Sequence, residues 1–138
     1  MRVRPQPLVG PSDQTGPVLL IDAANVVGSR PTGWWRDRAG AARTFVEQLH
    51  AAIASGRIVE PVIVVLEGKA REGAPSGLAD GVTVLHAGGS GDDAVIDVVA
   101  NASYQRVTLV TGDRELGRRA EALGAQVVRP GWLLALLE

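Results

Sequence analysis

The chain of 138 residues contains no cysteine, and this absence excludes several kinds of site at once. Without thiols there is no disulfide, no thiolate metal centre and no cysteine nucleophile. Histidine is nearly as scarce, because His50 and His86 are the only two, too few for a histidine-rich zinc site. We therefore expect any bound metal to be a hard cation held by carboxylate oxygens.

Long apolar runs are missing as well. No stretch approaches the roughly 20 apolar residues that a membrane helix needs, so we expect no membrane partner. Residues 1–17 contain arginines but lack the apolar segment of a secretory signal. We expect a flexible leader over 1–17, one folded domain over 18–138, and a cytoplasmic protein. The formal net charge of −1 gives no overall attraction to nucleic acid, although it is compatible with a local basic rim.

What the sequence does contain is an alternation of strand-like and helix-like segments. Continuous apolar runs typical of buried strands cover 18–21, 61–67, 81–87, 106–111 and 125–128. Helical spacing covers 33–56, 92–104, 114–124 and 130–138, and the glycine- and proline-rich residues 68–80 are expected to form a loop. This alternation predicts an α/β fold: a single three-layer α/β/α domain with a mainly parallel sheet of about five strands.

Acidic residues follow three of the expected strands. Asp22, Glu67 and Asp113 stand at carboxyl ends, which meet at one edge of a parallel sheet, where such folds bind ligands. Asp93 and Asp97 lie four residues apart on one face of the next expected helix. Carboxylates gathered in this way repel one another, and a divalent cation is the natural compensation. The pattern as a whole favours an acidic metal site.

Each acid also has a simpler explanation. Asp22 and Asp113 each have the position of a residue that caps the next turn or helix. Glu67 could be a solvated loop acid, and Asp93 with Asp97 a hydrated helix face. Asp92 is well placed as a cap or first-turn acid after the glycines that precede it.

The segments "LLIDAANVV", "VIVVLEG" and "DDAVIDVVANASYQRVTLVTGDREL" together resemble the PIN-like nuclease superfamily and, within it, the NYN-type domains. Asp22 and Asn25 match a strand that ends in Asp-x-x-Asn. Glu67 resembles the acid after the second strand, with Glu in place of the usual Asp. The helix acids of the family correspond to Asp93 and Asp97, and its last acid to Asp113.

This resemblance implies a sheet of order 3-2-1-4-5 and cleavage of RNA or, in some relatives, structured DNA, with Mg²⁺ or Mn²⁺ as cofactor. It implies that Asp22, Asp93 and Asp113 hold the principal ion, and that Asp97 and Glu67 reach a second ion or its waters. Asp92 remains an alternative to Asp93, which we favour because Asp93 pairs with Asp97 at helical spacing.

Several polar residues are candidates for contact with substrate. Asn25 would orient Asp22 or a phosphate, unless it is simply a turn amide bonded to backbone. Thr111 would bond a metal-bound water or simply finish the strand. Arg114 lies near a helix start, where it would meet a phosphate or remain an exposed arginine. The basic residues that could grip a strand are Arg30, Arg36, Arg38, Lys69 and Arg71. Trp34 and Trp35 flank them; one could stack on a base, and Trp35 is expected in the core.

Other functions remain in competition with an endoribonuclease. A haloacid dehalogenase-type phosphatase needs a second Asp two residues after the first, whereas Ala23 and Ala24 follow Asp22. The glycines of "GGSGDD" lack the spacing of a dinucleotide fingerprint. A non-catalytic RNA-binding or scaffolding domain and the toxin of a toxin–antitoxin pair stay open, as does a homodimer or a protein partner.

Overall fold

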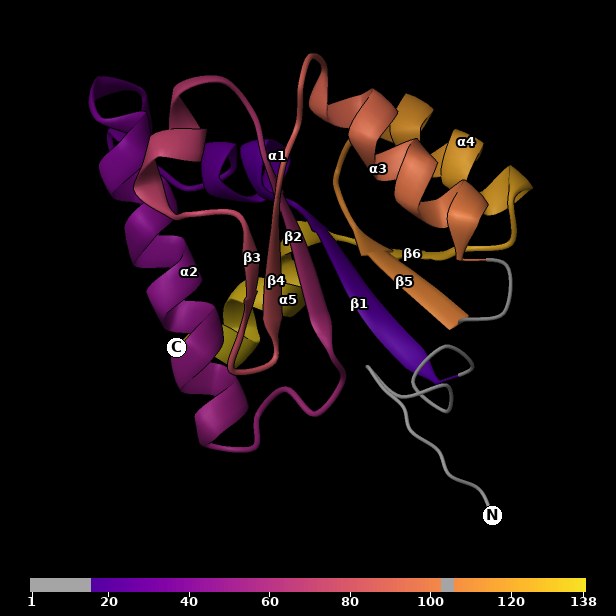
Figure 1. Ribbon diagram of the computed structural model, residues 1–138, viewed down its shortest axis with the longest axis horizontal. Helices are drawn as coiled ribbons and strands as arrows, with labels where there is room; N and C mark the ends of the chain where they lie inside the picture. Colours follow the sequence, from indigo (N-terminus) through magenta and orange to yellow (C-terminus); the bar gives the residue numbers. More distant parts are fainter. Residues whose placement is uncertain (1–15, 103–105) are drawn as a thin grey trace.

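The computed structural model describes residues 16–102 and 106–138, which form one six-stranded sheet between two layers of helices (Figure 1). Most of the expected leader over 1–17 lies outside the described residues. The strands are β1 (Pro17–Asp22), β2 (Val62–Leu66), β3 (Gly77–Ala79), β4 (Val82–His86), β5 (Arg106–Val110) and β6 (Gln126–Val128). The helices are α1 (Ala23–Gly28), α2 (Arg38–Ala54), α3 (Gly91–Asn101), α4 (Arg114–Ala122) and α5 (Pro130–Leu137), with 3₁₀ segments η2 (Trp34–Arg36) and η3 (Gly68–Gly73).

The sheet has the order β3-β4-β2-β1-β5-β6. All neighbouring strands are parallel except β3, which pairs antiparallel with β4. Without β3, the strands taken in chain order give 3-2-1-4-5, so the expected α/β class and strand order are confirmed. The central strand β1 is buried from Val18 to Asp22, because helices cover both of its faces.

The two helical layers enclose separate cores. α1, α2 and α5 pack on one face, where Val26, Phe45 and Leu133 are fully buried with side chains of β1 and β2. α3 and α4 pack on the other face, as Figure 1 shows at the upper right, and their buried residues include Val95 and Leu116. The apolar runs of the strands therefore supply side chains alternately to two cores.

Residues 68–80 are not the plain loop expected from their glycine and proline content. They contain η3 and the edge strand β3. The chain reverses between β3 and β4 at Asp80 and Gly81, both of which have positive φ, at 48° and 86°. An Asp-Gly pair in this conformation is the favoured two-residue hairpin turn, and it explains why a strand forms here.

The helix expected over 33–56 begins only at Arg38, because Asp37 caps it: the Oδ1 atom of Asp37 accepts a hydrogen bond from the Gly40 amide at 2.8 Å. Trp35 therefore precedes the helix, and the expectation that it belongs to the core is wrong, since it is 56% exposed. The short helix α1 was not expected at all. α3 ends at Asn101, and residues 103 and 104 of the predicted helix lie outside the described residues.

Within the described ranges, no helix has the length and apolar character needed to cross a membrane.

Candidate active site at the carboxyl edge of the sheet

The register of the central strands places the strand-end acids at one edge. Asp22 is level with Val65 of β2, two residues before Glu67. On the other side Ile21 is level with Val110 of β5, so that Asp22 lies beside Thr111. The parallel pairing predicted from the sequence thus brings the ends of β1, β2 and β5 together.

Asp22 is the most buried acid at this edge, with 5% of its surface exposed. Its Oδ2 atom accepts a hydrogen bond from the Thr111 hydroxyl at 3.0 Å, and its Oδ1 atom accepts a longer one from the Asn25 amide at 3.4 Å. The second bond makes Asp22 the cap of α1. Capping occupies one carboxylate oxygen only weakly, so it is compatible with a further role for Asp22.

The environment of Asp22 disfavours its charge. Burial is the main cause that raises its pKa from an ordinary 3.8 to about 6, and the negative charges of Asp92 and Glu67 add to the effect. The hydrogen bonds from Thr111 and Asn25 oppose it but do not cancel it. A buried carboxylate held among other acids is a group that a cation would stabilise.

Asp113 lies on the other side of Thr111. Its Oδ1 atom caps α4 by accepting from the Leu116 amide at 3.1 Å, and its own amide donates to the Thr111 hydroxyl oxygen at 3.1 Å. Through its hydrogen bonds with Asp22 and with the Asp113 amide, Thr111 connects Asp22 to the start of α4. Thr111 is 2% exposed, so the connection lies inside the protein. The Thr111 hydroxyl thus bonds both candidate acids.

At the start of α3 the structure favours Asp92 over Asp93. The pKa of Asp92 is raised first by burial and then by Asp113, with Asp93 adding to the effect and Arg119 opposing it. Asp92 and Asp22 also interact, since the charge of Asp92 raises the pKa of Asp22. One step along a helix turns a side chain by about 100°, so adjacent acids face different ways.

Asp93 and Asp97 lie away from this cluster. The Asp93 side chain is 77% exposed, and its Oδ1 atom lies 3.7 Å from Nη2 of Arg119 on α4. Asp97 is also exposed. The helix expected to carry these two acids on one face is confirmed, but that face is exposed and is not the one turned toward Asp22.

Glu67 follows β2 and lies against the start of α3. A Cβ atom placed on the buried Gly91 would collide with the Glu67 Oε1 atom. Glycine at this position thus lets the carboxylate approach the helix that holds Asp92. The longer side chain, which differs from the usual Asp of the resembled family, reaches the same edge.

The remaining candidates divide into structural and exposed groups. The Oδ1 atom of Asn25 accepts a hydrogen bond from the Gly112 amide at 2.6 Å, which ties α1 to the segment after β5. Arg71 donates to the Gly68 and Ala87 carbonyls at 3.0 and 3.3 Å. Lys69 and Arg114 are exposed and make no hydrogen bond or ion pair within the described part of the chain.

The acids at this edge have the donor chemistry of a metal site. All the donors are oxygens, which suits Mg²⁺ or Mn²⁺. Across residues 16–102 and 106–138, however, no three Asp, Glu or His side chains approach closely enough to hold an ion as they stand. The chemistry of Asp22, Asp92, Asp113 and Glu67 thus fits a divalent cation, while binding would require their side chains to converge.

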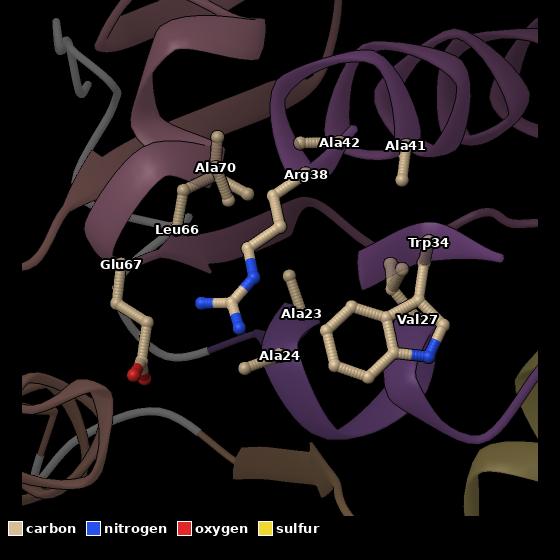
Figure 2. Close-up of a pocket in the computed structure, with 10 residues that line it drawn as sticks. All are labelled: Ala23, Ala24, Val27, Trp34, Arg38, Ala41, Ala42, Leu66, Glu67 and Ala70. Atoms are coloured by element: carbon tan, nitrogen blue, oxygen red, sulfur yellow. The ribbon is translucent and has the colours of Figure 1, made fainter. Parts of the chain in front are cut away.

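A pocket of about 150 Å³ adjoins the cluster at Glu67. Figure 2 shows the guanidinium of Arg38 and the indole of Trp34 extending into this space, with Ala23 and Ala24 of α1 between them in the view. The sequence did not predict this pocket, and it offered Asp92 only as the alternative to Asp93. Ser90 is the sequence signal for the start of α3, because its hydroxyl caps the helix by accepting a hydrogen bond from the Asp93 amide at 3.2 Å. The start of the helix in turn determines which acid faces inward.

Comparison with known proteins supports the fold. No protein-family model matches the chain, and no curated protein sequence matches it. Two similar solved structures are crystal structures of Rae1 (YacP) from Bacillus subtilis. One superposes with a TM-score of 0.66 at 20% identity, covering 87% of this chain and 72% of that one. The other, of a Rae1 mutant, gives a TM-score of 0.64 at 17% identity, covering 87% and 73%.

Proposed function

We propose that this protein is a metal-dependent endoribonuclease whose active site is the acidic cluster at the carboxyl edge. The observation that carries the proposal is Asp22, a buried carboxylate whose pKa is raised to about 6 and whose neighbours are also acids. Strongly perturbed acids gathered at a ligand-binding edge are typical of functional sites.

The fold adds independent support. The structures of Rae1 (YacP) superpose on most of this chain at 17% and 20% identity, which supports the α/β/α fold that carries the acids. The sequence segments that resemble NYN-type domains are the same segments that supply Asp22, Glu67 and Asp113 to the cluster. The residue pattern and its position in the fold therefore support the same proposal.

In this proposal Asp22, Asp92 and Asp113 would hold Mg²⁺ or Mn²⁺, with Glu67 reaching a second ion or its waters. Such an ion would activate water and stabilise the leaving oxygen in phosphodiester cleavage. Asp92 takes the place that the family pattern gave to Asp93.

The chain's own residues orient the acids and attract the substrate. The Thr111 hydroxyl fixes the Asp22 carboxylate by its hydrogen bond, while Asn25 holds the segment from which Asp113 projects. Lys69 and Arg114 are exposed cations near the edge and would contact phosphates of the RNA.

The test is cleavage of labelled single-stranded RNA in the presence of Mn²⁺, with double-stranded RNA and DNA as further substrates. Asp22→Asn and Asp113→Asn should each abolish cleavage while preserving the fold, because asparagine keeps the shape and capping oxygen but loses the charge. Asp97→Asn is the matched control and should remain active. Absence of metal-dependent hydrolysis by the wild-type protein on every substrate would contradict the proposal.

A non-catalytic RNA-binding domain is the second candidate, and one observation favours it. Among the described residues no three acids converge as a metal site would require. Such a domain would bind RNA without hydrolysing it, and its affinity would rise rather than fall when Asp22 loses its charge, since the acid repels the phosphate backbone.

A further inference from the structure

The pocket beside Glu67 has features that the acidic cluster does not use. Half of its lining residues are alanines, four from α1 and α2 and one from η3, and its charged groups are Arg38 and Glu67. Alanines at neighbouring positions of two packed helices leave a hollow that larger side chains would fill. A flat ring therefore has space there.

Trp34 provides an aromatic face at one side of this pocket. The indole is half-buried, and a Cβ atom at Gly28 of α1 would lie 3.6 Å from its Cζ2 atom. The indole therefore lies beside the end of α1, at the rim of the pocket. Its half-buried position leaves part of the ring open to a stacking ligand.

Arg38 provides a cation over the same ring. Its guanidinium carbon lies 5.5 Å from the Trp34 ring centroid, and within the described residues Arg38 makes no hydrogen bond or ion pair. The side chain is exposed and long, so it can leave the ring and donate to a ligand instead. Stacking of a base on an aromatic ring is stronger than an exposed cation–π contact, so a base would displace the guanidinium.

The pocket and the acidic cluster share Glu67. Glu67 lines the pocket, and its charge also acts on Asp22. A chain of nucleotides with one phosphate at the cluster would thus bring a neighbouring base to the pocket.

We propose that this pocket binds a single unpaired nucleobase of single-stranded RNA, next to the phosphate that is cleaved. The inference rests on the proposed function for the identity of its ligand. The base packs against Trp34 and the methyl groups of Ala23 and Ala24, while Arg38 donates to the acceptors on its edge. A cavity of about 150 Å³ is smaller than the about 300 Å³ of ordinary ligand pockets, so it accepts one base and not a duplex.

The chain contains a matched control for this pocket. Arg36 lies over Trp35 at 5.7 Å, which is nearly the same pairing as Arg38 over Trp34. Trp35 is 56% exposed, and neither Trp35 nor Arg36 lines the pocket. The two pairs have equal charge and aromatic content and differ in their access to the pocket.

The test measures binding of fluorescein-labelled oligoadenylate to proteins that also contain Asp22→Asn, so that turnover does not interfere. Trp34→Ala and Arg38→Gln should each weaken binding, the first by about 5- to 150-fold, as expected for the loss of one stacked base. Arg36→Gln and Trp35→Phe, which keeps a ring edge-on against Trp34, should change the affinity by less than about twofold, the range of a weak exposed contact. Equal losses from both pairs would overturn the inference.

A second measurement keeps the inference testable if Trp34→Ala fails to fold. In a protein containing Trp35→Phe and Trp132→Phe, adenosine 5′-monophosphate should quench the fluorescence of Trp34, whereas ribose 5-phosphate, which lacks a base, should not. Equal responses to the two compounds would contradict a base pocket. Failure of the proposed function has a different result: the wild-type protein would cleave no substrate while Trp34 still responded to the nucleotide.

Discussion

Two faces of α3 differ sharply although the acids on them are adjacent in the sequence. Asp92 turns inward, where burial and Asp113 raise its pKa and where its charge acts on Asp22. Asp93 and Asp97 turn outward, and Asp93 is 77% exposed beside Arg119. Acids of equal charge on one helix therefore differ in how strongly they interact with their neighbours. Water screens the charges of Asp93 and Asp97, whereas it screens the partly buried Asp92 less.

The largest expected effect is a difference in RNA cleavage between substitutions on the two faces of α3. Asp92→Asn should reduce Mn²⁺-dependent RNA cleavage at least about 100-fold. Loss of a group that supports a metal ligand costs up to about 100-fold, and loss of a direct ligand should cost no less. Asp93→Asn, the matched control one residue away, should retain activity within about threefold, because its contact with Arg119 is long and exposed. Initial rates at saturating Mn²⁺ measure both, and equal losses would remove the distinction.

The next effect concerns stability and follows from the raised pKa of Asp22. A carboxyl whose folded pKa is about 6 instead of 3.8 binds its proton more tightly in the folded state. The free energy of unfolding therefore falls as pH rises from about 3.8 to about 6. At about 1.36 kcal/mol for each unit of pKa difference, the total loss is about 3 kcal/mol. Asp22→Asn, which stays uncharged, should be about 3 kcal/mol more stable than wild type in EDTA at pH 8.

Urea denaturation at pH 4 and pH 8 checks this difference. The advantage of Asp22→Asn should almost vanish at pH 4, where the wild-type carboxyl is protonated in the folded state. A variant that is less stable than wild type at both pH values would show that the charge of Asp22 is not a burden on the fold.

A smaller effect is expected at Thr111, which joins the inner acids. Thr111→Val removes the hydroxyl that donates to Asp22 and accepts from the Asp113 amide. The pKa of Asp22 should then rise above about 6, and the protein should lose about 1–3 kcal/mol because the amide remains unpaired. Thr111→Ser, which keeps the hydroxyl, should behave like wild type in denaturation and in the pH dependence of cleavage.

The smallest effect is expected on the outer face. Arg119→Gln should change the free energy of unfolding by less than about 0.5 kcal/mol, because its contact with Asp93 is long and exposed. It should also raise the pKa of Asp92, which Arg119 lowers. Arg118→Gln is a control on the same helix, since Arg118 pairs with Glu115 instead. A large loss of stability in Arg119→Gln alone would mean that the outer pair is structural.

The fold was predictable because its signals are local and redundant. Continuous apolar runs such as 62–66 are too short for helices, and each is followed by a helix-like segment. The hairpin at Asp80 and Gly81 also had a local signal, but the glycine and proline content around it concealed the short strand β3. α1 was missed because its six residues continue the apolar run of β1 and contain no helical repeat.

The site was predictable in part. Asp22 and Asp113 lie at the ends of parallel strands as expected, and both cap helices, a role that leaves the proposed metal binding open to test. Asp92 was not predictable from spacing, because which face of α3 turns inward depends on packing against the sheet. The pocket depends on how α1 meets α2 at Ala23 and Ala42, a contact between distant segments that periodicity does not reveal.

The most direct test of the account is a calorimetric titration of Mn²⁺ into four proteins at pH 7.5: wild type, Asp22→Asn, Asp92→Asn and Asp93→Asn. The account predicts binding by wild type and by Asp93→Asn with similar affinity, and its loss in Asp22→Asn and Asp92→Asn. The heat of binding reports the site without reference to any substrate. Binding that is absent from all four proteins, or equal in all four, would contradict a metal site at the carboxyl edge of the sheet.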